Sequence, residues 1–169
     1  MEDDFSFSGH TPGVPEANRN VVAAHGYMEL DMPAYAWREL EEARDEPGLR
    51  PAVAKVEVLL HCREKKWKEA LEVSDELCGS EPGEPFGFIH SAYCLHEMGQ
   101  TDEARRRLAD GPKSLRHEPV YFYNLACYDA ILGRREDALE NLDKAFALDK
   151  SLVESARADD DLRSLHGAF

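Results

Sequence analysis

Residues of the same kind recur in this chain at a fixed interval of 34 positions. Proline keeps that interval at Pro51, Pro85 and Pro119. Small residues keep it independently in two sets, Ala36, Ala70, Ala104 and Ala138, and Ala24, Val58, Ala92 and Ala126. Close helix crossings admit only small side chains, so such residues on two helices per period are typical of stacked helix pairs. The chain is therefore expected to be a helical repeat protein.

The period divides most of the chain into four units and leaves a segment at each end. The expected units are residues 17–50, 51–84, 85–118 and 119–152. Residues 1–16 are acidic and end in two prolines and a glycine, which oppose helix, so we expect a flexible N-terminal arm. Phe5 and Phe7 leave open that this arm docks on the array. Residues 153–169 alternate apolar and charged positions, as expected of a C-terminal capping helix and tail.

Three local signals predict where individual helices begin and end. Asp31, followed by Pro33, is expected to cap the second helix of the first unit. Thr101 is expected to do the same in the third unit, after a turn at Gly99. Gly111-Pro112 stands where the other units continue their second helix, so that helix should end early.

The acidic composition limits the classes of partner. Acidic residues outnumber basic ones by 34 to 20, for a formal net charge of −14, so a nucleic-acid partner is not expected. The start of the chain lacks the basic residues and apolar run of a secretory signal, and no stretch is long enough to cross a bilayer. Its four cysteines form no CxxC pair and are interpreted as reduced thiols. We therefore expect a cytoplasmic protein without a membrane partner.

The fourth unit carries a pattern that resembles a known family. The pattern consists of Asn124-Leu125-Ala126, Tyr128, Leu132-Gly133-Arg134, Asp137-Ala138-Leu139, Lys144-Ala145-Phe146 and Leu148-Asp149. In these residues the unit is similar to the tetratricopeptide repeat (TPR); the third unit repeats the theme, and the first two are looser copies. The segment from Asp159 to Leu165 looks like the closing segment of many small bacterial TPR proteins.

This resemblance covers residues 17–152 and implies both a fold and a binding surface. The implied fold is all-α, a right-handed superhelical array of antiparallel helix pairs, and the implied surface is a concave groove that accepts an extended peptide or a helix. The positions that the family turns toward its groove correspond here to His25, Lys55, Leu59, Cys62, Arg63, Phe86, Ile89, His90, Tyr93, His96, Tyr123, Asn124 and Cys127.

The expected groove is aromatic and mildly basic. Tyr93 and Tyr123 could hold an apolar side chain while Lys55 and Arg63 meet a carboxylate, and Asn124 could bind peptide backbone. The alternative remains open that the tyrosines only pack between helices and that the cations are neutralised by neighbouring glutamates, Glu57 and Glu64. The Lys and Asn residues of the two-carboxylate clamp that grips chaperone tails are absent from the corresponding positions.

Catalytic, metal and cofactor sites are not expected. The chain contains no phosphate-binding glycine loop and no nucleophile elbow. His90, Cys94 and His96 lie close in sequence, but their spacing fixes no fourth ligand, so no metal site is predicted there. The basic run Arg105-Arg106-Arg107 is interpreted as a solvated helix face, offset by nearby acids.

The sequence thus predicts a non-catalytic module for protein–protein interaction. It would bind a peptide or helix of a partner protein in its groove, as an adaptor or assembly factor. Two alternatives stay open: a self-assembling scaffold, in which the chain forms homo-oligomers, and a dedicated secretion chaperone, a class also built from a few TPRs in a small acidic chain.

Overall fold

The computed structural model describes residues 19–46 and 48–169 of this chain. The N-terminal arm expected at residues 1–16 lies outside the described residues. The chain divides into two compact units, residues 1–53 and residues 54–169, and the boundary falls within one helix.

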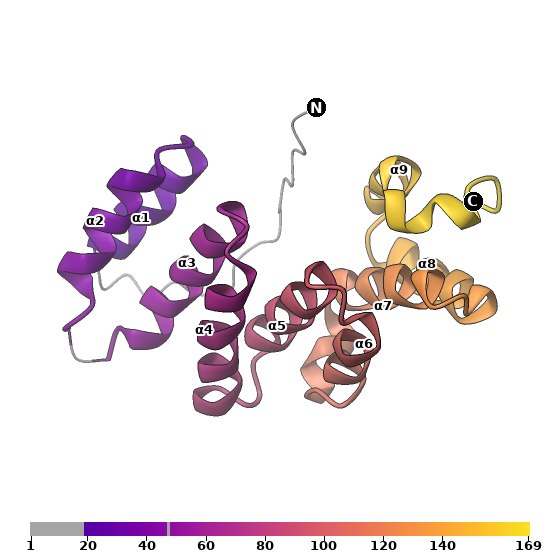
Figure 1. The fold of residues 1–169 in the computed structure, drawn as a ribbon, viewed down its shortest axis with the longest axis horizontal. Coiled ribbons are helices and arrows are strands. Elements are labelled where there is room, and N and C mark those ends of the chain that lie inside the picture. Colours follow the sequence, from indigo (N-terminus) through magenta and orange to yellow (C-terminus); the bar gives the residue numbers. More distant parts are fainter. Residues whose placement is uncertain (1–18, 47) are drawn as a thin grey trace. The chain divides into compact units, whose positions relative to one another are not determined.

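Unit 1 contains one complete helix pair and the beginning of a third helix. The pair is α1 (Arg19–Glu29) and α2 (Pro33–Ala43), and α3 (Arg50–Arg63) starts in this unit and continues into unit 2 (Figure 1). Ala24 of α1 and Ala36 of α2 are fully buried, as is Leu40. The small side chains therefore lie where the two helices meet.

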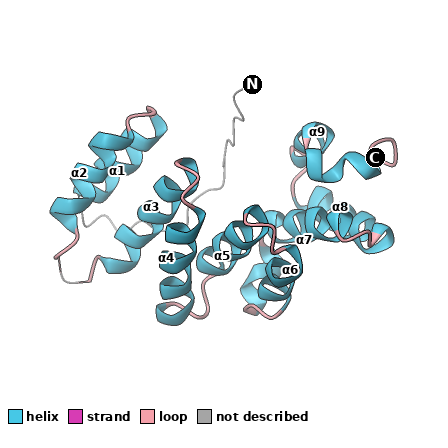
Figure 2. Ribbon diagram, viewed as in Figure 1, coloured by secondary structure: helices cyan, strands magenta, loops and turns pink. Residues whose placement is uncertain are grey.

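Unit 2 continues as a series of helices joined by short turns. After α3 they are α4 (Trp67–Ser80), α5 (Pro85–Glu97), α6 (Thr101–Ala109), the 3-10 helix η1 (Lys113–His117), α7 (Pro119–Ile131), α8 (Arg135–Leu148), α9 (Leu152–Ala158) and the 3-10 helix η2 (Asp160–Leu165). The parts of the chain that the structure describes contain helices and turns and no strand (Figure 2). The predicted all-α class, with helices packed in adjacent pairs, is confirmed.

The repeating small residues form the contacts between helices. Val58, Ala92 and Ala126 on the first helices of successive pairs are completely buried, and so are Ala70, Ala104 and Ala138 on the second helices. A third recurring position is filled by Leu40, Leu108 and Leu142, with Ser74 in its place on α4, and all four are at most 1% exposed. The hydroxyl of Ser74 has no hydrogen-bond partner among the described residues.

Gly87 permits a close approach between α4 and α5. A Cβ atom at this position of α5 would lie 2.9 Å from the backbone nitrogen of Cys78 and 2.9 Å from the backbone oxygen of Ser74, both on α4. Real Cβ atoms essentially never come so near to backbone atoms. Glycine is therefore required here by packing, not by an unusual backbone angle.

The turns inside the helix pairs repeat one geometry at the same interval as the sequence. Asp31, Lys65, Gly99 and Gly133 all have positive φ, at 55°, 55°, 79° and 75°. In each turn the following amide donates to the carbonyl oxygen five residues earlier, as Lys66 N does to His61 O at 2.8 Å and Gln100 N to Leu95 O at 2.8 Å. This is the Schellman arrangement, which ends a helix with one left-handed residue.

Two expected helix caps are wrong. Asp31 ends α1 in the left-handed conformation, and α2 begins after Met32 without a side-chain cap. Thr101 lies inside the first turn of α6, where its hydroxyl meets Nδ1 of His96 at 3.0 Å. Both residues stand one position away from a cap: Asp31 before Met32, and Thr101 after Gln100.

The early end of the second helix in the third pair is confirmed. α6 stops at Ala109, whereas α4 and α8 each run for 14 residues. Gly111 and Pro112 follow, and the chain then forms η1, whose Leu115 is 1% exposed and belongs to the main core.

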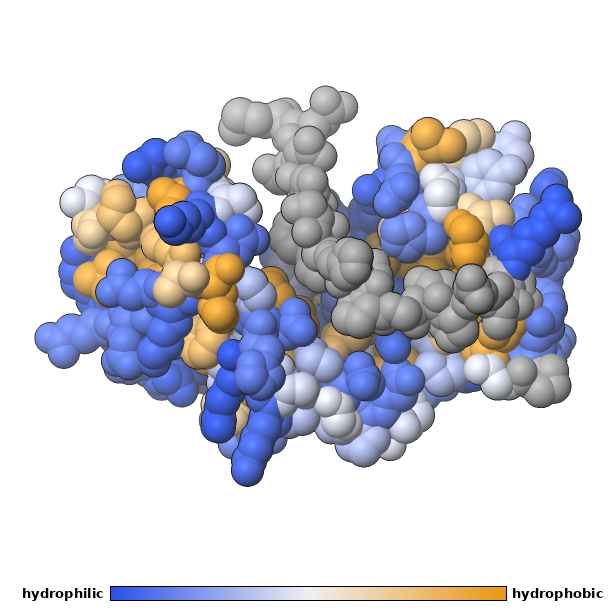
Figure 3. Space-filling view, turned by 180° about the vertical axis from the view of Figure 1, so that it is seen from behind, coloured by the Kyte–Doolittle hydropathy of each residue, from blue (hydrophilic) through white to orange (hydrophobic). Residues whose placement is uncertain are grey.

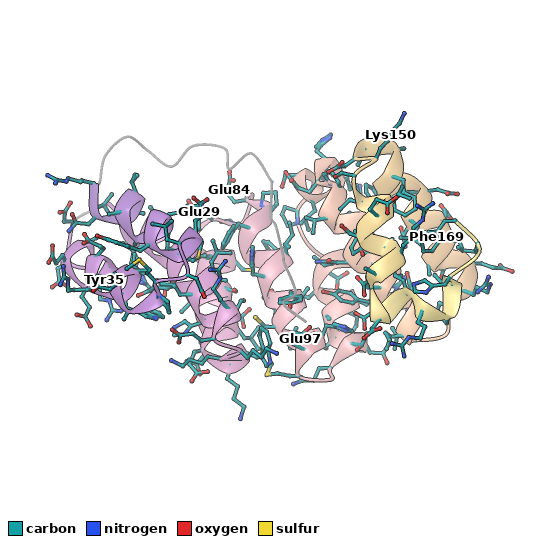
Figure 4. The ribbon with its side chains drawn as sticks, turned by 90° about the horizontal axis from the view of Figure 1, so that it is seen from above. Glu29, Tyr35, Glu84, Glu97, Lys150 and Phe169 are labelled. Carbon is teal, nitrogen blue, oxygen red and sulfur yellow. The ribbon has the colours of Figure 1, made fainter. Side chains whose placement is uncertain are left out.

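The end of the chain folds back onto α7 instead of continuing as one helix. α9 stops at Ala158, Asp159 is extended, and η2 follows. Leu162 and Leu165 of η2 are buried in the core that α5, α6, α7 and α8 form. Phe169 packs edge-on against Phe146 at a centroid distance of 5.7 Å (Figure 4). The expected single capping helix is therefore two short elements, and the second one covers α7.

Among the described helices, none combines the length and the apolar character needed to cross a membrane.

Candidate functional site

The side chains that α3 and α5 present together form the first part of the candidate site. Leu59 and Cys62 on α3 and Tyr93 on α5 are half-buried, and Arg63 on α3 is exposed. The ring of Tyr93 meets Trp67 edge-on at a centroid distance of 5.7 Å. The sulfur of Cys62 lies 3.8 Å from that of Cys94 in α5. This α3–α5 face is thus an apolar and aromatic surface with a cation at its edge.

Lys55 lies near the middle of α3 and is already paired. Its Nζ is 2.8 Å from a carboxylate oxygen of Glu81, which follows α4. The sequence interpretation named Glu57 and Glu64 as the neutralising acids, and for Lys55 the structure places Glu81 in that role. A partner's carboxylate would have to compete with this ion pair, so Lys55 is weakly suited to be an anchor.

Two of the expected groove residues on α5 are buried. Ile89 and His90 are each 7% exposed. His90 stacks on Phe86 at 4.0 Å, and its Nδ1 lies 2.9 Å from the backbone oxygen of Phe86. Burial lowers the pKa of His90 to about 4, against a smaller opposite effect of that hydrogen bond. His90 is therefore neutral at physiological pH, and its ring packs against the ring of Phe86.

The chain's own C-terminal segment occupies the expected ligand face of α7. The hydroxyl of Tyr123 donates to Oδ2 of Asp159 at 2.8 Å, and the buried thiol of Cys127 lies 3.7 Å from the same oxygen. His96 of α5 meets the segment too, through Nε2 at 2.9 Å from Oδ2 of Asp161. Three of the predicted groove residues therefore hold the protein's own end.

These contacts set the protonation of the covered groups. Burial, with Cys127 and Asp159 nearby, raises the pKa of Tyr123. Burial and the charges of Asp159 and Asp161 raise the pKa of the Cys127 thiol well above its usual range. Burial lowers the pKa of His96, but the bond to Asp161 and the surrounding acids outweigh it and raise the pKa overall. The junction thus holds a neutral phenol, a neutral thiol and a histidine inclined to carry a proton.

The two remaining predicted residues are Asn124 and His25. Asn124 is half-buried on α7. His25 belongs to unit 1, where its Nδ1 is 3.5 Å from a carboxylate oxygen of Glu29, one turn further along α1.

The basic run on α6 is not a solvated face, contrary to the sequence interpretation. Arg105 donates to Asp129, a carboxylate on α7 that is completely buried, and Arg107 donates to Asp75 on α4. Only Arg106 pairs locally, with Glu103. Since the acids lie 24 and 32 residues from their arginines, helical spacing within α6 could not reveal them.

Comparison with known proteins identifies the type of fold but does not assign the chain to a family. No family model and no curated protein matches this chain. Among solved structures, it is similar to MamA AMB-1, a TPR-containing protein, with a TM-score of 0.61, 20% sequence identity, and coverage of 77% of this chain and 76% of that chain. At that identity the likeness concerns the fold, which is a TPR-like helical repeat.

Proposed function

We propose that this protein is a non-catalytic binding module that docks a segment of a partner protein on its α3–α5 face. The observation that carries the proposal is the partial exposure of apolar and aromatic side chains on two helices at equivalent positions. Leu59 and Tyr93 are one repeat apart, and both stay half-buried although nearby small residues of the same helices are fully buried. Aromatic side chains beside an arginine are the residues that most often anchor protein interfaces.

The covered face of α7 supports this location within unit 2. Tyr123 and Cys127 are engaged by Asp159, so a partner that lay along α7 would first have to displace the C-terminal segment. That segment holds Leu162 and Leu165 in the core, and displacing them would expose both leucines to water. On the α3–α5 face, Leu59 and Tyr93 stay partly exposed among the described residues, and Arg63 is exposed. The likeness to MamA AMB-1 supports a repeat scaffold for this role and names no partner.

The self-assembling scaffold is the second candidate, and one observation favours it. α1, α2 and the turn between them leave large apolar side chains exposed, with Val22 at 56% and Leu30 at 70%. Orange apolar residues interrupt the blue surface over this unit in Figure 3. Exposed apolar residues that gather on one element pair are typical of an interaction surface. In this alternative, the surface of unit 1 pairs with a second copy.

Co-purification with matched variants separates the two candidates. The tagged chain is recovered from its native lysate as the wild type, as Arg63→Glu with Tyr93→Ala, and as Arg106→Glu, which changes an exposed arginine of α6. The proposal expects a protein that copurifies with the wild type and with Arg106→Glu and is lost from the double variant, at unchanged helicity. A protein retained by all three rules out the α3–α5 face. A mass that rises with concentration, and falls in Leu30→Ser, supports the scaffold instead.

A further inference from the structure

The junction between α5, α7 and η2 gathers three potential metal ligands, and a histidine contacts one of them. Sγ of Cys127 and carboxylate oxygens of Asp159 and Asp161 all lie within 4.8 Å of one another. Nε2 of His96 lies 2.9 Å from Oδ2 of Asp161. A thiol, an imidazole and two carboxylates thus converge from segments more than 30 residues apart in sequence.

Hydrogen bonds around the junction already orient these groups. Nδ1 of His96 meets the hydroxyl of Thr101 at 3.0 Å, which directs Nε2 toward Asp161. Oδ1 of Asp159 accepts the backbone amide of Asp161 at 3.0 Å, and Oδ2 accepts the hydroxyl of Tyr123. A histidine that ligates a metal typically uses its second nitrogen in such a bond, and ligating carboxylates are held in the same manner.

Among the described residues, the charged groups that act on the junction are mainly negative. The charged groups that act on the buried thiol of Cys127 are Asp159 and Asp161, and both are negative. Glu97, the last residue of α5 (Figure 4), also interacts electrostatically with His96. The base that meets this cluster is His96, which can supply at most one positive charge. A divalent cation would offset both carboxylates and would favour the thiolate over the thiol.

We propose that Cys127, His96, Asp159 and Asp161 bind a divalent cation of the zinc class. Zinc takes sulfur, imidazole nitrogen and carboxylate oxygen in tetrahedral sites, with bonds of about 2.0–2.3 Å, so neighbouring ligand atoms stand roughly 3.3–3.8 Å apart. Sγ of Cys127 and Oδ2 of Asp159 are separated by 3.7 Å, within that interval. His96 contacts only Asp161 of this group, so its ring would have to shift toward Cys127 and Asp159 to complete the site, with Nε2 free of its proton.

Binding couples the cation to protons and to the end of the chain. The cation replaces the thiol proton of Cys127 and, below neutral pH, a proton of His96, and both protons pass to solvent. Because two ligands lie at the start of η2, the cation would tie this element to α5 and α7. Sequence spacing could not predict the site, since its donors come from three segments more than 30 residues apart and the expectation of no metal was argued from His90, Cys94 and His96.

Cobalt substitution tests the site in the full chain. Protein stripped with a chelator is titrated with Co²⁺, and the thiolate-to-cobalt charge-transfer absorption is followed. We expect one equivalent to bind with that absorption. Cys127→Ser should abolish the band, and Asp161→Asn should weaken binding by about 10-fold or more. Asp160→Asn is the matched control, because Asp160 lies between the two ligands but pairs with Arg163 on the surface; it should bind as the wild type does.

The other cysteines and the fold need separate controls. Cys62→Ser with Cys94→Ser removes the second thiol cluster, and the band should persist in that variant. Zn²⁺ should raise the Tm of the wild type more than the Tm of Asp161→Asn at the same Zn²⁺ concentration, at equal helicity before addition. The proposal is overturned if no stoichiometric binding occurs, if Cys127→Ser retains the band, or if the band disappears with Cys62 and Cys94 instead.

Discussion

Lys65 adopts a backbone conformation that suits glycine better than lysine. It ends α3 with φ of 55°, at the position that Gly99 and Gly133 fill in the later pairs. A side chain with a Cβ atom is strained there by roughly 1–2 kcal/mol. Glycine would relieve this strain, but its greater conformational freedom in the unfolded chain would offset part of the stabilisation. The sequence shows this substitution as a departure from the repeat, and the structure shows that the backbone keeps the geometry anyway.

Replacing Lys65 by glycine should therefore stabilise the protein. We expect Lys65→Gly to raise the free energy of unfolding by about 1 kcal/mol, measured by urea denaturation. Gly99→Ala is the reciprocal change, and it should lower that free energy by about 1 kcal/mol, because nothing lies within 4 Å of its added Cβ and only the backbone is strained. Equal signs for the two changes would contradict this explanation.

His90 should make the stability of unit 2 depend on acid. Burial lowers its pKa to about 4 in the folded chain, against a value near 6.5 when unfolded. Between these pKa values, the unfolded state therefore binds more protons than the folded state. The stability that the neutral, buried His90 contributes is complete above about pH 6.5 and is lost as the pH falls toward 4. It amounts to at most ~3 kcal/mol.

Denaturation between pH 4 and pH 7 measures this effect. His90→Gln should remove the part that His90 contributes to the slope of the unfolding free energy against pH. His25→Gln, which changes the half-buried histidine of unit 1, should leave that slope as in the wild type. A wild-type slope in His90→Gln would show that the histidine is not buried as a neutral group.

At the scale of elements, α4 and α5 pack closely because of Gly87. An added methyl group would press against backbone atoms of Ser74 and Cys78, which cannot turn aside as a flexible side chain would. We expect Gly87→Ala to lower the free energy of unfolding by about 1–3 kcal/mol. Gly79→Ala in α4 is the control, since its Cβ would meet open space and alanine favours a helix; it should leave stability unchanged or raise it slightly.

Asp129 ties three helices of unit 2 together. It is completely buried on α7, accepts from Arg105 of α6 and from Asn141 of α8 at 3.2 Å, and lies 3.6 Å from Arg134. We expect Asp129→Ala to cost about 3–5 kcal/mol in thermal or urea unfolding, because it leaves a half-buried arginine unpaired. Asp102→Ala breaks only an exposed pair with Arg134 and should cost less than about 1 kcal/mol. Similar costs for both would mean that burial of Asp129 is not decisive.

The helix pairs could be predicted because the same residue types recur in each pair. Contacts that occur only once in the chain were missed. Ala36, Ala70, Ala104 and Ala138 share one environment, so their spacing alone indicates the helix pairs. Arg105 finds its acid on another helix, and no local pattern marks that pairing. The same holds for the candidate site. The family's groove positions identified Tyr93 on the α3–α5 face, but they could not show that the hydroxyl of Tyr123 donates to Asp159 of the chain itself.

At the scale of the whole molecule, the proposed binding surface in unit 2 is only part of the groove that the repeat pattern predicts. The C-terminal segment covers α7, while α3 and α5 keep half-buried apolar side chains beside Arg63. Within unit 2, the C-terminal segment thus lies on α7, and the proposed binding face lies on α3 and α5. Its proposed role in binding a partner protein depends on the available face.

Site-specific photo-crosslinking tests that central claim most directly. A photoreactive phenylalanine analogue is placed at Arg63 on α3 or, as the control, at Arg106 on α6, and the protein is irradiated in its native cells. If the α3–α5 face binds a partner, the Arg63 position captures a different protein and the Arg106 position does not. Capture only from Arg106, or capture only of a second copy of this chain, would contradict it.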